Sequence, residues 1–189
     1  MSGKKENIVL KIVVLGDPGV GKTSLVKKFA ENEFKEDYKP TLGVNIIIKE
    51  MAVKEMKIEN RIAQVQLVLV LWDVTGQIEY DISREKVFHR ADGALLIYDI
   101  TRDPTLRNIE EKWIEDFKKN AKKDGPYILI GNKLDLEDSR AISTDDGKKY
   151  SKIIRAVDFI ETSAKHGENV ENVFKKLIDN ILKNRGVEL

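Results

Sequence analysis

The sequence of 189 residues contains no cysteine, only two histidines and only four prolines. Without cysteine the chain can form no disulfide and no thiolate metal site, and it offers no residue for prenylation or palmitoylation. Ser2 follows Met1, so the glycine that N-myristoylation requires is missing too. We therefore expect no direct lipid anchor.

The sequence also has no large excess of charge of one sign and no long apolar run. The 33 basic and 32 acidic residues give a net charge of +1, so no global field favours nucleic acid or an anionic membrane. No apolar run approaches the length of a membrane span. The early run Ile8 to Leu15 contains Lys11, which indicates a buried strand rather than a signal peptide. The sequence predicts a cytoplasmic, monomeric protein with a single domain over residues 1–189.

Apolar runs alternate with amphipathic segments along the chain. This pattern is typical of an α/β fold in which helices cover both faces of a mostly parallel sheet. Helices are predicted over 24–30, 109–121, 144–152 and 170–182. The predicted strands are Ile8 to Leu15, Val44 to Val53, Arg61 to Trp72, Gly93 to Asp99, Tyr127 to Gly131 and Val157 to Glu161.

The segments 44–58 and 61–72 form an unusually long predicted hairpin around Glu59-Asn60. Its arms exceed the usual 5–6 residues of a strand, and Glu-Asn is a weak hairpin turn. Charged residues along the first arm would blunt an exposed sheet edge. The hairpin is then either a solvated tip or a surface that binds a partner.

The strongest chemical signal lies between the first strand and the first helix. Glycines there let the backbone turn tightly and approach a phosphate, and N–H groups at the helix start favour an anion. Lys22 supplies an ammonium for the β- and γ-phosphates, and Thr23 supplies a hydroxyl for Mg²⁺. The predicted phosphate loop and helix start comprise Gly16, Asp17, Pro18, Gly19, Val20, Gly21, Lys22, Thr23 and Ser24.

A phosphate loop alone fits a kinase, an ATPase or a GTPase, and later motifs distinguish them. Asp73 ends the third strand, where a carboxylate can hold a Mg²⁺ water. Gly76 offers a backbone N–H to a γ-phosphate, and Gln77 has the donor and acceptor needed to orient an attacking water.

Two stretches after the fifth and sixth strands predict guanine. The Asp135 carboxylate can accept two parallel hydrogen bonds from guanine, which adenine does not offer in that arrangement. The Ala164 N–H would meet the guanine carbonyl oxygen from the same rim of the sheet. The candidate residues of the two stretches are Asn132, Lys133, Asp135, Ser163, Ala164 and Lys165. An adenine-nucleotide kinase or ATPase would leave them without a role.

With these motifs in order, the chain from Lys11 to Leu182 resembles the Ras-like small GTPases, closest to the Rab and Ras branches. The resemblance implies a three-layer α/β/α P-loop NTPase fold. Its six-stranded, mostly parallel sheet would have the order 2-3-1-4-5-6, with strand 2 antiparallel at the edge. A prokaryotic or archaeal member would fit the missing cysteines.

The resemblance also implies a molecular switch that binds GTP or GDP with Mg²⁺ and hydrolyses GTP. Protein effectors and regulators would bind residues 36–46 and 74–90. Phe34 would pack against the guanine, and Tyr38 and Thr41 would belong to the first switch. The implied catalytic residues are Gln77, Lys22 and Thr41, and the implied metal ligands are Thr23, Thr41 and Asp73.

Some positions depart from the family pattern. Pro18 stands where relatives usually carry glycine or serine, and we expect it to change the response to an activating partner more than nucleotide affinity. Ile78 replaces the usual carboxylate after Gln77. These changes keep open a guanine-nucleotide-binding interaction module with negligible hydrolysis.

Overall fold

The computed structural model of the chain describes residues 5–31, 43–59, 61–74 and 81–188. The strands in these ranges are β1 (Glu6–Leu15), β2 (Val44–Glu50), β3 (Lys54–Ile58), β4 (Arg61–Val74), β5 (Gly93–Asp99), β6 (Tyr127–Asn132), β7 (Asp158–Thr162) and β8 (Val187–Glu188). The helices are α1 (Lys22–Glu31), α2 (Asp81–Phe88), α3 (Asp103–Asn108), the π-helix η1 (Ile109–Ile114), α4 (Glu115–Asn120), the 3-10 helix η2 (Leu134–Ser139), α5 (Thr144–Ile153) and α6 (Val170–Asn184).

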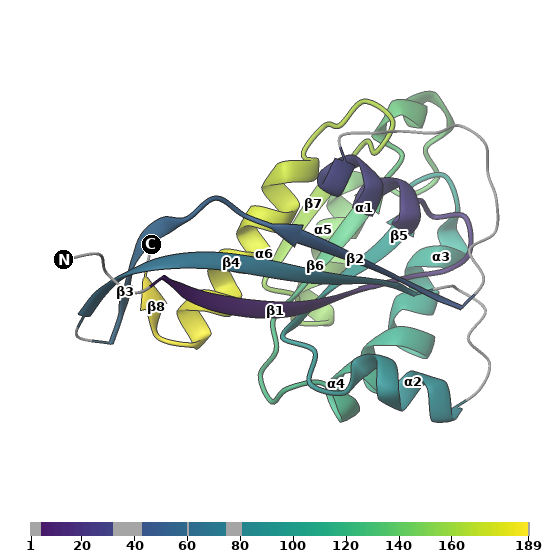
Figure 1. The fold of residues 1–189 in the computed structure, drawn as a ribbon. Coiled ribbons are helices and arrows are strands. Elements are labelled where there is room, and N and C mark those ends of the chain that lie inside the picture. Colours follow the sequence, from purple (N-terminus) through teal and green to yellow (C-terminus); the bar gives the residue numbers. More distant parts are fainter. Residues whose placement is uncertain (1–4, 32–42, 60, 75–80, 189) are drawn as a thin grey trace.

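The strands form one sheet in the order β7-β6-β5-β1-β4-β3-β8, and β2 pairs with β4 beside β3 (Figure 1). Strands β1, β4, β5, β6 and β7 run parallel, whereas β2 and β3 are antiparallel to β4. The predicted strand order is confirmed and β2 is the predicted antiparallel edge strand, but the described residues form eight strands rather than the predicted six, because the first arm of the hairpin is divided and β8 is added. The prediction of a single domain stays a prediction, although one sheet runs through the described residues.

The predicted first arm of the long hairpin was wrong in one respect, because it is two strands rather than one. Glu50 pairs with Val68 and Lys54 pairs with Val65. From Glu50 to Lys54 the first arm advances by four residues, whereas the second arm advances by three. The first arm therefore contains one extra residue, as in a β-bulge. Residues 51–53 take up this mismatch between β2 and β3.

The outer edge of the hairpin is covered only at its distal end, on β3, whereas β2 stays an edge strand with the charged residues that the sequence predicts. The end of the chain returns after α6 and forms β8, in which Glu188 pairs with Lys57 and Val187 pairs with Ile58. Buried Asp92 lies just before β5 and accepts hydrogen bonds from the Lys11 amide (2.8 Å), from Lys122 (2.5 Å) and from Arg185, so it ties β1 to the loop after α4 and to the end of α6.

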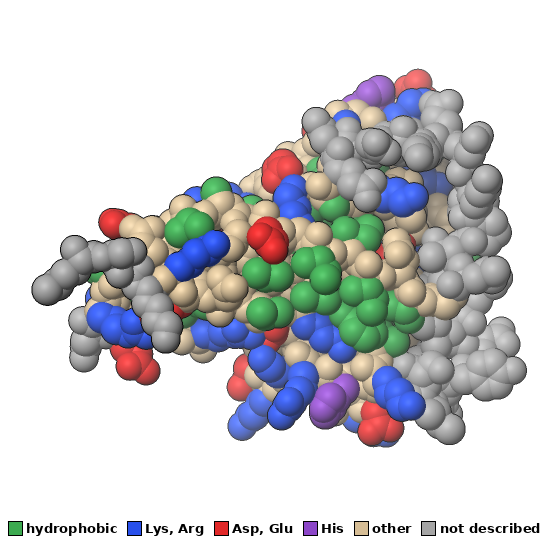
Figure 2. All heavy atoms as spheres, in the orientation of Figure 1, with side chains coloured by type: hydrophobic (Ala, Val, Ile, Leu, Met, Phe, Trp, Pro, Cys, Tyr) green, Lys and Arg blue, Asp and Glu red, His purple; other side chains and the backbone are tan. Residues whose placement is uncertain are grey.

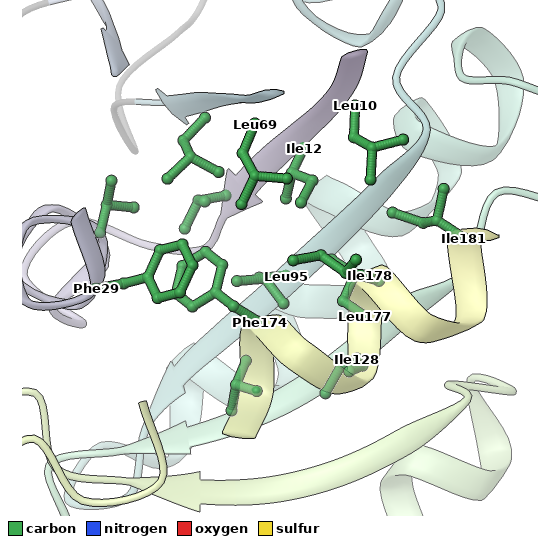
Figure 3. Packing of buried hydrophobic residues seen from close by; sticks show 14 of the residues in the cluster. Leu10, Ile12, Phe29, Leu69, Leu95, Ile128, Phe174, Leu177, Ile178 and Ile181 are labelled. Carbon is green, nitrogen blue, oxygen red and sulfur yellow. The ribbon is translucent and has the colours of Figure 1, made fainter. Parts of the chain in front are cut away.

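Helices α1 and α6 cover one face of the sheet. Their apolar side chains meet the alternate residues of β1 and β4, and Figure 3 shows Leu10, Ile12 and Leu69 pointing toward α6. The Phe29 and Phe174 rings stack with their centroids 3.7 Å apart, which joins the two helices. The predicted apolar stripe of the last helix is therefore the stripe that closes this core.

Helices α2, η1, α4 and α5 cover the opposite face around β5 and β6. Ile109, Trp113 and Phe117 are buried there, as their spacing predicts. The helical segment begins earlier than predicted, at Asp103, because Pro104 occupies its first turn, where proline needs no N–H acceptor. The Ser143 hydroxyl accepts the Asp146 N–H at 3.1 Å and caps α5 as predicted.

The helices leave one part of the sheet bare. Figure 2 shows apolar side chains gathered on an open face of the molecule. Val9 of β1 and Ile46 and Ile48 of β2 are exposed. Ile46 lies opposite Trp72 and Ile48 lies opposite Val70, so each exposed isoleucine of β2 forms a cross-strand pair with a half-buried apolar residue of β4. Across the described parts of the chain, no helix is both long enough and apolar enough to cross a bilayer.

Candidate functional site

The candidate site lies at the carboxyl-terminal rim of the parallel strands, where open α/β sheets bind ligands. The phosphate loop follows β1, Asp73 lies near the end of β4, and residues 132–135 and 163–165 follow β6 and β7. Hydrogen bonds join the stretches, since Thr23 pairs with Asp73 and Asn132 with Val20. The sequence motifs, which are far apart along the chain, thus lie together.

Two glycines of the loop are required by geometry. Gly16 has φ +142° and a Cβ there would lie 2.1 Å from the Ile97 carbonyl oxygen. Gly21 has φ +99° and a Cβ there would lie 2.2 Å from the amide nitrogen of the Asn132 side chain. Any side chain at either position would be strained and would collide with a neighbouring strand or its end.

Lys22 is buried inside the loop. Its ammonium donates to the carbonyl oxygens of Gly16 at 2.8 Å and Asp17 at 2.9 Å. Burial lowers the pKa of Lys22 to about 8, although the nearby Asp73 and Asp17 carboxylates act in the opposite direction. A polyphosphate would be a stronger acceptor for this cation than two neutral carbonyls.

The pair Thr23 and Asp73 fits a hard divalent cation. The Thr23 hydroxyl donates to Asp73 Oδ2 at 2.5 Å. The other carboxylate oxygen, Oδ1, is buried and has no hydrogen-bond partner among the described residues. Burial raises the pKa of Asp73, opposed by the Thr23 hydrogen bond and the Lys22 charge. An unpartnered carboxylate oxygen beside a hydroxyl is a ligand set suited to Mg²⁺.

Asn132 connects three strand ends. Its side-chain amide donates to the Val20 carbonyl oxygen at 2.9 Å. Its Oδ1 accepts the Thr162 hydroxyl at 2.9 Å and the Ala164 N–H at 3.2 Å. The Ala164 N–H that was predicted to meet guanine therefore has a partner within the chain, and Asn132 acts as a brace between the phosphate loop and the 163–165 loop.

The Asp135 carboxylate accepts the Ser163 hydroxyl at 2.7 Å, which fixes one oxygen of the predicted guanine-binding group. Lys133 has the left-handed φ of +74°, and its ammonium lies 2.7 Å from Asp99 Oδ2. Among the other predicted residues, Val20 is buried, Ser24 lies in the first turn of α1, and Lys165 is exposed.

Asp17 points away from where a nucleotide was predicted. Its carboxylate accepts the Asn108 side-chain amide at 2.5 Å, and the Trp113 ring nitrogen lies 3.4 Å from its other oxygen. The side chain thus anchors the loop to α3 and η1. The part of Asp17 that lines the loop is its backbone, whose carbonyl oxygen accepts a hydrogen bond from Lys22.

Two residues of this rim were not predicted as site residues, Asp99 and Arg102. Asp99 ends β5 and binds Lys133, Thr101 and Arg102. Arg102 also donates to the Pro18 carbonyl oxygen at 3.0 Å. Their position just after a parallel strand is the signal that would have found them.

Five predicted residues lie outside the described residues, and their roles stay predictions. They are Phe34, Tyr38, Thr41, Gly76 and Gln77. The middle of the predicted hairpin turn, Asn60, also lies outside them.

The fold and the rim define a P-loop nucleotide-binding protein of the three-layer α/β/α class. The Ras family profile matches residues 11–183. Rab-12 of Mus musculus is 37% identical over 174 residues, which covers 92% of this chain and 68% of that protein. Rab-11B of Dictyostelium discoideum is 38% identical over 183 residues, which covers 95% and 78% respectively. RABA4b of Arabidopsis thaliana is 37% identical over 177 residues, which covers 94% and 74%.

The chain belongs to the Ras family. It is a small GTPase that binds guanine nucleotide and acts as a nucleotide-dependent switch toward effectors and regulators. The interaction module without hydrolysis, which the altered residues kept open, is not favoured.

Proposed function

We propose that this GTPase binds GTP or GDP together with Mg²⁺ and hydrolyses GTP slowly without a partner. Rates of roughly 10⁻⁴ to 10⁻² per second are typical of switches acting alone, and a partner's arginine can add a factor of about 10³ to 10⁵. The observation that carries the proposal is the Thr23–Asp73 pair, with its buried unpartnered carboxylate oxygen, beside the buried ammonium of Lys22.

Each described group has a distinct task in the proposal. Lys22 would exchange its two carbonyl acceptors for phosphate oxygens. Thr23 would ligate Mg²⁺ directly and Asp73 through a water, and the bound Mg²⁺ would neutralise charge on the phosphates. Asp135 would accept the guanine N1–H and 2-amino groups, supported by Ser163.

The water that attacks the γ-phosphate needs a residue to orient it, and we assign this task to Gln77. Thr41 and Gly76 would contact the γ-phosphate and would lose this contact when the phosphate leaves. Two loops would then relax, which is the switch.

Effectors and regulators would bind residues 36–46 and 74–90. These ranges include the residues whose contacts with the γ-phosphate would differ between the GTP and GDP states. Ile46, at the end of the first range, belongs to the exposed apolar group on the bare sheet face. A contiguous apolar surface of this kind is suited to a protein partner. We propose that the free GTPase is a monomer, because charged Lys49 and Glu50 on β2 disfavour edge-to-edge pairing.

Single-turnover hydrolysis of preloaded GTP with Mg²⁺ tests the proposal, with Gln77→Leu as the comparison. We expect a slow native rate that falls at least tenfold in the variant, while GDP affinity changes little. Loading without measurable hydrolysis in the native protein would contradict the catalytic part. Failure to load GTP would contradict the whole proposal.

A further inference from the structure

An arginine lies against the tip of the phosphate loop. The Arg102 terminal nitrogen Nη2 donates to the Pro18 carbonyl oxygen at 3.0 Å. A Cβ built on Gly19 would lie 3.7 Å from the same nitrogen. The guanidinium therefore covers the backbone of residues 18 and 19, at the part of the loop that curves around a phosphate group.

The base of this guanidinium is fixed by a buried carboxylate. Arg102 Nε donates to Asp99 Oδ2 at 2.9 Å, and the Asp99 side chain is only 1% exposed. Burial alone would raise the pKa of Asp99, but hydrogen bonds from Lys133, Thr101 and Arg102 outweigh it and lower the pKa. Asp99 is therefore ionised at neutral pH and holds the arginine by charge.

The far end of the guanidinium is held more weakly. Its acceptor there is the neutral Pro18 carbonyl, and hydrogen bonds to charged acceptors are roughly twice as strong as those to neutral ones. Pro18 has no N–H, so the loop itself offers no backbone donor at that residue. Arg102 supplies N–H donors and a positive charge at the same place.

We propose that Arg102 is a built-in catalytic arginine of this GTPase, whose guanidinium exchanges the Pro18 carbonyl for a phosphate oxygen of bound GTP. The inference rests on the proposed function and adds to it the source of the arginine. Asp99 acts as the positioning residue that aims the guanidinium.

The chemistry needs no proton from the arginine. A water oxygen forms the new bond to the γ-phosphorus while the bond from γ-phosphorus to the β–γ bridging oxygen breaks. GDP leaves with the bonding electron pair, and the water protons end on inorganic phosphate and in solvent. Arg102 donates hydrogen bonds to oxygens that gain negative charge, which stabilises the transition state.

The first test is single-turnover hydrolysis of preloaded GTP with Mg²⁺ and no partner protein. GTPases with the arginine on the same chain hydrolyse at about 10⁻² per second, against about 4 × 10⁻⁴ per second without it. We expect Arg102→Ala to lower the rate by about 25-fold and Arg102→Lys to recover part of the loss. Arg107→Ala is the matched control, since Arg107 is 72% exposed and pairs with Asp103 one turn along α3.

The second test separates catalysis from structural support. Fluoroaluminate with GDP and Mg²⁺ mimics the transferring phosphoryl group, and its binding is measured by tryptophan fluorescence and by retention of the complex on gel filtration. We expect the native protein and Arg107→Ala to form the complex without a partner. We expect Arg102→Ala not to form it, while its GDP affinity stays within about threefold of the native value.

The outcomes are distinguishable. If Arg102→Ala hydrolyses GTP at the native rate, this inference is wrong while the proposed function stands. The same holds if the variant loses GDP affinity and hydrolysis rate by equal factors, because that result indicates a structural role for Arg102. Failure of the native chain to load GTP would overturn the proposed function and this inference with it.

Discussion

Replacing Asn132 with alanine should loosen the whole rim of the sheet. The Asn132 side chain is 2% exposed and makes three hydrogen bonds, to the Val20 carbonyl, the Thr162 hydroxyl and the Ala164 amide. Alanine would leave three polar groups without their partner, and each buried, unsatisfied group costs about 1–3 kcal/mol.

The three costs do not add fully, because one side chain makes all three bonds and the neighbours relax together. We therefore expect Asn132→Ala to lower the free energy of unfolding by about 3–6 kcal/mol, the lower half of the simple sum of about 3–9 kcal/mol. Nucleotide affinity should fall by at least tenfold, or about 1.4 kcal/mol, because the loops on both sides of the site lose their common brace.

Equilibrium urea unfolding in Mg²⁺, repeated at several GDP concentrations, separates the two effects, since bound GDP adds a concentration-dependent stabilisation. Release of a fluorescent GDP analogue gives the affinity change independently. Asn120→Ala is the control, because Asn120 is half-buried and donates to the Asp116 carbonyl within its own helix, α4. A loss below about 1 kcal/mol in Asn132→Ala, or one equal to the control, would refute the reasoning.

Other predictions follow from the same geometry. Gly21→Ala should abolish GDP binding in a fluorescence titration, because its Cβ would lie 2.2 Å from the Asn132 side chain. Gly43 also has a positive φ, but no described residue lies within 4 Å of a Cβ there, so Gly43→Ala should bind GDP and lose about 1–2 kcal/mol of stability. Removing Mg²⁺ with EDTA should speed GDP release from the native protein at least tenfold in stopped-flow. If EDTA speeds GDP release from Thr23→Ala by the same factor, the Thr23 hydroxyl is not a ligand of Mg²⁺. Asp92→Ala should lower the urea midpoint by an amount equivalent to about 1–3 kcal/mol, and an unchanged midpoint would show that this buried carboxylate does not stabilise the junction of β1 with the end of α6.

Much of the site could be predicted because it depends on local signals. The phosphate loop, Asp73 and the residues after β6 each follow an apolar strand, and parallel strands bring their carboxyl ends to one rim. The buried faces of α6 and of the segment around Trp113 likewise follow from the helical period.

The remainder depends on contacts that the sequence does not encode locally. The bulge at 51–53 is visible only once β2 and β3 are aligned against one strand, and β8 adds a short strand from the far end of the chain. The Asp17 side chain could have pointed at the nucleotide, but Asn108 lies close enough to bind it. Arg102 meets Pro18 across 84 positions of sequence, which no local pattern predicts.

The continuous pairing of β4 limits how the nucleotide state can be transmitted. This strand of 14 residues pairs with β1 on one side and with β2 and β3 on the other. A slip by one residue would turn Leu69 out of the core and Val70 into it, so β4 can change its register against its partners only in two-residue steps of about 6.6 Å. Small register shifts are therefore excluded. A displacement of Asp73 that is smaller than such a step must move β4 together with the strands paired to it.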